Sequence, residues 1–157
     1  MTSSQLDVRR GSQVPRLEHY PLYTTTAADD AVDLAAAVGL VLDPWQEYVL
    51  RGSLGERPDG RWTSFRSCLV VPRQNGKNAV LEARELAGLF LFGERLIIHT
   101  AHEFSTARES MLSMMNRLRG SDLMEYGAGF DEGDDEDKAI SGMKVGNTDP
   151  GITLKNG

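Results

Sequence analysis

The chain has 157 residues, of which 40% are hydrophobic, 25% charged and 7% aromatic, a composition typical of one globular core. Its net charge of -6 arises near the end, because residues 1–119 hold 14 bases and 14 acids whereas residues 120–157 hold 3 bases and 9 acids. A uniformly basic nucleic-acid-binding module is therefore excluded. The single cysteine, Cys68, excludes a disulfide scaffold and a four-thiolate zinc site.

The sequence contains no segment typical of a membrane or secreted protein. The longest uninterrupted apolar stretch runs only from Leu86 to Phe92, well short of the ~20 residues that span a bilayer. The N-terminus lacks the basic start and long apolar segment of a secretory signal. We therefore expect a soluble intracellular protein, in which Cys68 is a small buried side chain.

The first third of the chain predicts an arm followed by two helices. Residues 1–28 show no periodicity, which indicates a mobile N-terminal arm or a strap lying on another part of the protein. Apolar residues at helical spacing then predict a helix that Asp30 caps and that ends at Gly39. A second helix is expected from Pro44 to Leu50, with one side formed by Trp45, Tyr48 and Val49. The glycine-rich residues 52–60 predict a loop.

The middle of the chain alternates predicted strands and helices. Residues 62–65 and 67–71 are rich in aromatic and β-branched residues, and the second run is apolar on both faces, as in a central parallel strand. A buried helix is expected over residues 78–92 and a second strand over residues 96–100. Another helix should open with a capping box formed by Thr106 and Glu109 and should end before Gly120. Its apolar stripe consists of Ala107, Met111, Met114, Met115 and Leu118. This order predicts an α/β domain with a parallel sheet and right-handed crossovers.

The last part of the chain combines an acidic stretch with one strand. Six of the seven residues 131–137 are acidic, which predicts a solvated loop. Residues 152–155 predict a strand, and the following Asn156 and Gly157 form the strongest short signal for a hairpin turn. We expect the chain to be interrupted at this turn, with the return strand missing; a disordered tail that ends in Asn-Gly is the alternative.

Residues 71–78 (VPRQNGKN) join the predicted strand to the predicted helix, where a phosphate-binding loop directs backbone N–H groups at an anion. Gly76 and Lys77 match the pattern G-x-x-x-x-G-K-[ST], whereas Val71 replaces its first glycine and Asn78 its hydroxyl residue. The pattern alone leaves a phosphate loop and an ordinary strand-to-helix turn equally open.

The charge of the loop favours phosphate binding. Lys77 is the only lysine in the first 137 residues, and 13 of the 17 bases are arginine. An ammonium group at a helix N-terminus is repelled by the helix dipole unless an anion accompanies it. Arg73 adds a second positive charge that can neutralise a transferring phosphoryl group. We therefore assign candidate catalytic roles to Arg73 and Lys77.

The string VPRQNGK resembles the deviant Walker A loop of tailed-phage terminase large subunits, which also lacks the first glycine. Residues 42–46 (LDPWQ) resemble the adenine-recognising segment upstream of that loop, and residues 100–102 with the helix after them resemble the strand and helix that follow it. The resemblance covers residues 29–157. It implies the front half of a P-loop (RecA-like) ATPase domain with a parallel sheet, lacking its C-terminal strands and the nuclease domain.

The resemblance also implies a function, cofactors and partners. Such proteins are bacteriophage molecular motors in the host cytoplasm, hydrolases that use ATP and Mg²⁺ to package double-stranded viral DNA. The implied partners are double-stranded DNA, a portal protein, the terminase small subunit and the remaining half of the terminase chain. The complete protein would form a homo-oligomer and would not contact a membrane.

The resemblance further implies a nucleotide-binding set. Gln46 would read the adenine edge, and Asn78 is the candidate magnesium ligand, although its amide oxygen is a poorer ligand than the usual hydroxyl. The implied contacts to the nucleotide are Trp45, Gln46, Pro72, Arg73, Gln74, Asn75, Gly76, Lys77 and Asn78.

Catalysis by the chain alone is not expected. An apolar strand that ends in Asp-Glu would hold magnesium and orient water, and the sequence has none; its acidic residues 134–136 fall in the acidic loop instead. We therefore expect weak ATP binding and negligible hydrolysis. Two alternatives are an interaction or structural module without nucleotide chemistry, and a small P-loop phosphotransferase, which lacks a well-placed base. His99 and His102 have no partners at metal-ligand spacing, so no metal site is expected there.

Overall fold

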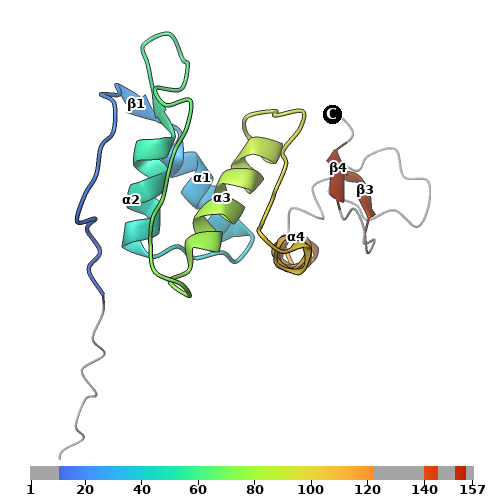
Figure 1. The fold of residues 1–157 in the computed structure, drawn as a ribbon. Helices are drawn as coiled ribbons and strands as arrows, with labels where there is room; N and C mark the ends of the chain where they lie inside the picture. Colours follow the sequence, from blue (N-terminus) through green and yellow to red (C-terminus); the bar gives the residue numbers. More distant parts are fainter. Residues whose placement is uncertain (1–10, 122–139, 145–150, 155–157) are drawn as a thin grey trace, which may run out of the picture.

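The computed structural model describes residues 11–121, 140–144 and 151–154. In chain order, the elements of this part are β1 (Thr25–Thr26), α1 (Ala28–Ala37), α2 (Pro44–Ser53), β2 (Gly55–Glu56), α3 (Lys77–Phe90), α4 (Phe104–Arg119), β3 (Ile140–Lys144) and β4 (Gly151–Leu154) (Figure 1). The strands form two antiparallel pairs, β1 with β2 and β3 with β4. Among these helices, none has both the length and the apolar character needed to cross a bilayer.

The core of the described part lies around α3, which contacts α1, α2 and α4 (Figure 1). Ala31 and Ala35 of α1 and Ala83 of α3 are fully buried, and their small side chains let these two helices approach closely. Leu50 of α2 and Leu86 of α3 fill the larger spaces of the same core. The site described below lies at the N-terminus of α3.

Helix α1 confirms the predicted periodicity but not the predicted cap. The helix begins at Ala28, so Asp30 lies within its first turn instead of capping it. The Thr26 hydroxyl accepts a hydrogen bond from the Ala28 N–H at 3.2 Å and satisfies one of the free donors of the first turn. Gly39 follows the helix with a φ of +77°, the left-handed conformation predicted to end it.

Helix α2 begins at Pro44 as predicted and continues three residues beyond Leu50, to Ser53. On the side predicted from Trp45, Tyr48 and Val49, Trp45 and Val49 are half-buried and Tyr48 is exposed, and the buried residues of the helix include Gln46 and Leu50. The polar Gln46 is tolerated inside because both its amide oxygen and its amide nitrogen have hydrogen-bond partners, as described below.

The two later helices differ from their predicted limits by one to three residues. Helix α3 covers residues 77–90 instead of 78–92. Helix α4 begins after Glu103, which is its N-cap, so the capping box predicted at Thr106 is wrong. Its end before Gly120 and its buried stripe of Met114, Met115 and Leu118 are confirmed.

Residues 62–65, 67–71 and 96–100 form no paired strand within the described part, apart from an isolated bridge between Glu56 and Trp62. The Trp62 ring lies 5.1 Å from the ring of Phe92, just beyond the C-terminal end of α3. From Trp62 the chain runs back along α3 to the N-terminus of this helix. The Glu94 N–H donates a hydrogen bond to the Gly88 carbonyl near the C-terminal end of α3. From there residues 96–100 also run back along α3 (Figure 1). The two segments therefore run in the same direction, as in a strand–helix–strand unit. No described strand lies beside them, and the parallel sheet stays a prediction.

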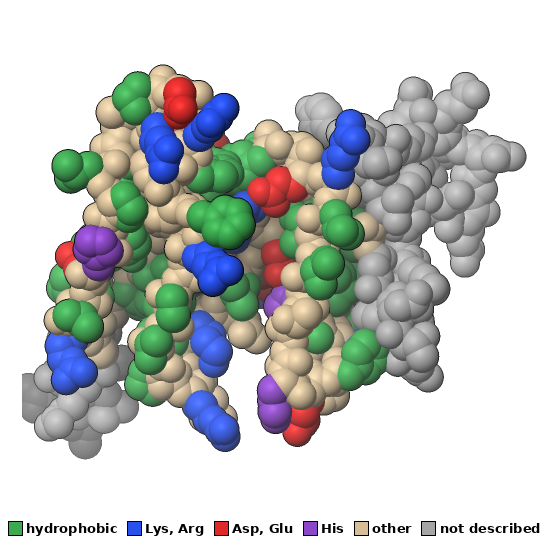
Figure 2. Space-filling model, turned by 45° about the horizontal axis from the view of Figure 1, so that its top comes forward, with side chains coloured by type: hydrophobic (Ala, Val, Ile, Leu, Met, Phe, Trp, Pro, Cys, Tyr) green, Lys and Arg blue, Asp and Glu red, His purple; other side chains and the backbone are tan. Residues whose placement is uncertain are grey.

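Half-buried and exposed side chains alternate along these two segments, as expected where one side of an extended chain faces α3. Leu69 and Ile97 are half-buried, whereas the neighbouring Val70 and Ile98 are 89% and 73% exposed. Cys68 is exposed, so its predicted burial is wrong, and 67–71 is not covered on both faces by the described residues. Figure 2 shows hydrophobic side chains at the surface in several places on one face of the molecule.

The N-terminal strap, residues 11–26, lies against α2 and β2. The Tyr48 hydroxyl donates to the Glu18 carboxylate at 2.6 Å, and the Thr24 N–H donates to the Glu56 carbonyl at 2.9 Å. Residues 1–10 of the predicted arm lie outside the described residues.

Strand β4 overlaps the predicted strand at residues 152–155. It pairs with the preceding strand β3, and Met143 lies opposite Ile152. The acidic stretch at residues 131–137 and the predicted turn at Asn156 and Gly157 lie outside the described residues.

Candidate functional site

The Gly76 loop, residues 71–77, turns the chain sharply into α3. Gln74 and Gly76 both have left-handed backbone conformations, with φ of +62° and +73°. Such a conformation is uncommon for a residue with a side chain, as at Gln74, and is found in turns and functional loops. None of the backbone N–H groups from Arg73 to Asn78 donates to a described acceptor. The loop therefore presents free donors at a helix N-terminus, where the dipole also favours an anion.

Gln46 ties the first turn of α2 to this loop. Its side chain is almost completely buried, with 5% of the residue exposed. Its Oε1 accepts a hydrogen bond from the Asp43 N–H at 2.7 Å, and its Nε2 donates to the Gly76 carbonyl at 2.8 Å. A Cβ atom on Gly76 would lie only 2.9 Å from this Nε2, so the close approach requires glycine. Sequence reasoning missed this role, although Asp43-x-x-Gln46 has capping-box spacing.

A cavity of about 1830 Å³ lies beside the loop, between the strap, the start of α2, residues 64–72 and α3. Six of the nine predicted nucleotide contacts line it: Trp45, Pro72, Gln74, Asn75, Gly76 and Lys77. The other three, Gln46, Arg73 and Asn78, are not part of its wall. The structure thus brings most of the predicted set together at one end of the cavity.

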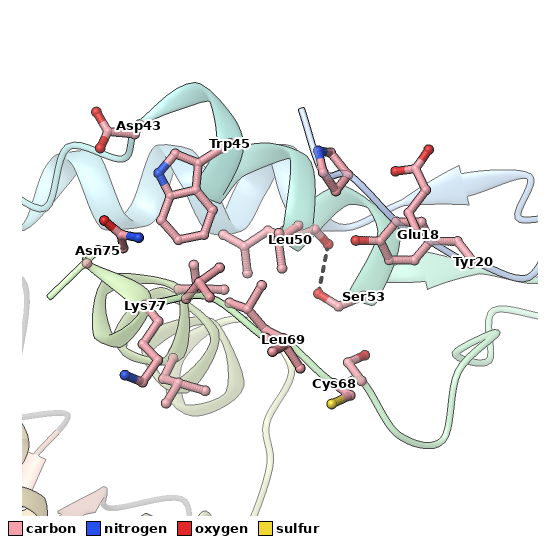
Figure 3. A pocket seen from close by; sticks show the side chains of 18 of the residues that line it. Glu18, Tyr20, Asp43, Trp45, Leu50, Ser53, Cys68, Leu69, Asn75 and Lys77 are labelled. Carbon is pink, nitrogen blue, oxygen red and sulfur yellow. Dashed lines mark hydrogen bonds between the residues drawn. The ribbon is translucent and has the colours of Figure 1, made fainter. Parts of the chain in front are cut away.

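The cavity has an aromatic and apolar part next to its polar end. Figure 3 shows the Trp45 ring between α2 and the loop, with Asn75 beside it and Lys77 extending from the start of α3 on the side away from the ring. Leu50 lies near the ring, and Leu69 lies farther from it on residues 64–72 (Figure 3). This arrangement can hold a flat apolar group against Trp45 while an anionic group reaches the loop.

The described residues fit an anion better than a metal ion. Arg73 is exposed in the loop, and the Asn78 amide nitrogen donates to the Ser110 hydroxyl of α4 at 3.4 Å. Within the described ranges, no group of three or more His, Cys, Asp or Glu residues could hold a metal. Magnesium prefers several oxygen ligands including carboxylates. Among the described residues, the side-chain oxygens near the start of α3 include one carboxylate, Asp43, and the amide oxygens of Gln74, Asn75 and Asn78.

A second group of titratable residues lies between α3 and the segment after it, and the sequence did not predict it. His99 Nδ1 lies 2.6 Å from the Glu85 carboxylate, with both side chains mostly buried. Burial raises the pKa of Glu82, and the Arg117 guanidinium, 3.0 Å away, opposes this shift. The available signal was the pair of glutamates three residues apart on a mostly apolar helix. These contacts join α3 to its neighbours, and they do not line the cavity beside the loop.

Comparisons with protein-family models, with curated proteins and with solved structures find no match for this chain. The interpretation of the site therefore depends on its own residues and geometry, together with the resemblance carried by the loop sequence.

Proposed function

We propose that the Gly76 loop binds the triphosphate of ATP and that the chain is the ATP-binding portion of a DNA-packaging motor similar to the phage terminase large subunits. The observation that carries the proposal is the run of six backbone N–H groups without a described acceptor, from Arg73 to Asn78, at the start of α3. The adjacent Lys77 and the nearby Trp45 supply the positive charge and the aromatic surface that a nucleotide requires.

In the proposed complex, the loop N–H groups donate hydrogen bonds to phosphate oxygens. The Lys77 ammonium offsets the negative charge of the phosphates, which in turn relieves its repulsion by the dipole of α3. Arg73 is exposed in the same loop and can rotate towards the outer phosphate. The base stacks on Trp45, while Leu69 contacts the sugar.

The motor function adds partners and chemistry that are part of the same proposal. ATP would supply the phosphoryl group whose hydrolysis drives packaging, and Mg²⁺ would accompany it in the host cytoplasm. Asn78 fits magnesium poorly, because it offers an amide oxygen where such loops have a hydroxyl. The proposed partners are double-stranded DNA, a portal protein, the terminase small subunit, the rest of the motor chain and further copies of it.

The test is a titration with a fluorescent ATP analogue at two salt concentrations. We expect Lys77→Ala to weaken binding about tenfold, the effect of losing roughly 1.4 kcal/mol of charge-assisted contact. Added salt should weaken binding to the original chain more than binding to Lys77→Ala. The matched control is Arg61→Ala, which removes one exposed positive charge from the β2 end of the molecule, away from the loop.

Equal affinity in the original chain, Lys77→Ala and Arg61→Ala would overturn the proposed function. The second candidate, an interaction module without nucleotide chemistry, would then be favoured. The exposed Val70 and Ile98 side chains are the observation that supports that candidate.

A further inference from the structure

We propose that Gln46 positions the phosphate-binding loop and does not read the base, so that the site recognises the polyphosphate chain and does not select adenine through this residue. The proposal rests on the proposed function, because it assumes that the Gly76 loop binds phosphates. It replaces the adenine-reading role that the sequence resemblance implies for Gln46. Gln46 is thus a positioning residue, and the ligand class extends to nucleoside triphosphates with other bases.

The protein backbone holds the Gln46 amide in a buried position outside the cavity wall. A glutamine amide recognises an adenine edge by using its oxygen as acceptor and its nitrogen as donor together. Here the oxygen already accepts from the Asp43 N–H and the nitrogen already donates to the Gly76 carbonyl. The residue is 5% exposed and is not part of the cavity wall, whereas the adjacent Trp45 is. Reading adenine would therefore require Gln46 to leave its buried position and turn into the cavity.

The same contacts explain how Gln46 acts on phosphate binding. The Gly76 carbonyl and the Lys77 N–H belong to one planar trans peptide unit, so they point in opposite directions. Gln46 Nε2 and the Ala79 N–H both donate to this carbonyl, at 2.8 Å and 3.1 Å, and together they fix the plane of the unit. The Lys77 N–H is consequently directed away from the Gln46 amide.

Base stacking on Trp45 is compatible with this assignment. Every base has a flat face, and stacking of a base on an aromatic side chain is tolerant of base identity. Trp45 lines the cavity, while its backbone N–H contacts Gln13 of the strap at 3.4 Å. The site thus combines a base-tolerant aromatic surface with a phosphate loop whose geometry depends on Gln46.

The test compares three ligands by calorimetric titration of the full chain: ATP, GTP and inorganic tripolyphosphate. We expect Gln46→Ala to weaken all three by a similar factor, about tenfold, with the ratio of the ATP and GTP affinities unchanged. Gln46→Glu retains the acceptor for the Asp43 N–H but loses the donor to Gly76, so its losses should be at least as large. Thr63→Ala is the matched control, because the buried Thr63 hydroxyl also donates to a backbone carbonyl, that of Gly55, outside the loop and the cavity wall, and its loss should not change the tripolyphosphate affinity.

Two other results would overturn the proposal in distinguishable ways. If Gln46→Ala weakens ATP alone and leaves GTP and tripolyphosphate unchanged, Gln46 reads adenine and the proposed function survives. If the original chain binds none of the three ligands, the proposed function fails and this proposal fails with it.

A measurement on the original chain keeps the test independent of how the variants fold. In the ATP complex, the side-chain amide protons of Gln46 should show no nuclear Overhauser contact to the adenine protons in nuclear magnetic resonance spectra. Such a contact would show that Gln46 reads the base and would overturn the proposal.

Discussion

Replacing Gly76 by alanine tests the contact between α2 and the Gly76 loop. Alanine at a φ of +73° should cost about 1–2 kcal/mol, the ordinary penalty of the left-handed conformation. The new Cβ would lie 2.9 Å from Gln46 Nε2, which must move and lose its hydrogen bond to the Gly76 carbonyl. Leaving a buried donor without a partner costs about 1–3 kcal/mol more. We therefore expect Gly76→Ala to lower the free energy of unfolding by about 2–5 kcal/mol.

The matched control is Gly93→Ala. Gly93 has a φ of +62°, and a Cβ there would meet no atom within 4 Å, so this variant carries only the conformational penalty. Urea unfolding, followed by tryptophan fluorescence, gives both free energies. In a Gln46→Ala background the extra cost of Gly76→Ala should vanish, because the opposing side chain is gone. Equal destabilisation by the two glycine variants in the original background would refute the reasoning.

Three further predictions concern other contacts. The hydrogen bond to Glu18 raises the pKa of Tyr48 to about 12, so this contact is present below pH 10 and is lost as pH rises through 12. Ultraviolet titration of tyrosinate, with Tyr48→Phe to assign the transition, should show that Glu18→Gln lowers this pKa; an unchanged titration would contradict the contact. Burial raises the pKa of the Glu82 carboxyl group, so the folded state favours its protonated form. The stability that this form contributes is complete below the ordinary carboxyl pKa and is lost as pH rises through the raised pKa. Urea midpoints measured across this range should lose that slope in Glu82→Gln, and an identical slope would argue against it. The exposed side chains of Val70 and Ile98 should cause concentration-dependent association, which light scattering detects. The double variant Val70→Ser, Ile98→Ser should associate less. An original chain that is monomeric at all concentrations would contradict this prediction.

The helices could be predicted because their signals are local. The spacing of Ala31 and Ala35, the proline at position 44 and the stripe of Met114 and Met115 each depend on residues within a few turns. Helix starts were less accurate, since Thr26 caps α1 from outside the predicted helix. Residues 67–71 and 96–100 have the composition of strands, but a strand forms only beside a neighbour, and the described part supplies none.

The site was predictable in position but not in every role. The loop sequence placed Gly76 and Lys77 correctly at the start of α3, since the pattern itself requires a turn before a helix. The resemblance grouped Gln46 with the nucleotide contacts, whereas the structure directs both ends of its amide to the protein backbone. That difference depends on how α2 packs against the loop, a long-range contact that spacing along the sequence does not specify.

The most direct test of phosphate binding is to follow the backbone amide signals of the chain in nuclear magnetic resonance spectra while ATP is added. The proposed site predicts the largest shifts at residues 73–78, whose N–H groups have no described acceptor, with a smaller shift of the Trp45 indole N–H. Lys77→Ala should reduce these shifts at the same ATP concentration. Unchanged signals at residues 73–78, or shifts that occur only elsewhere in the chain, would contradict the claim that this loop binds a nucleotide.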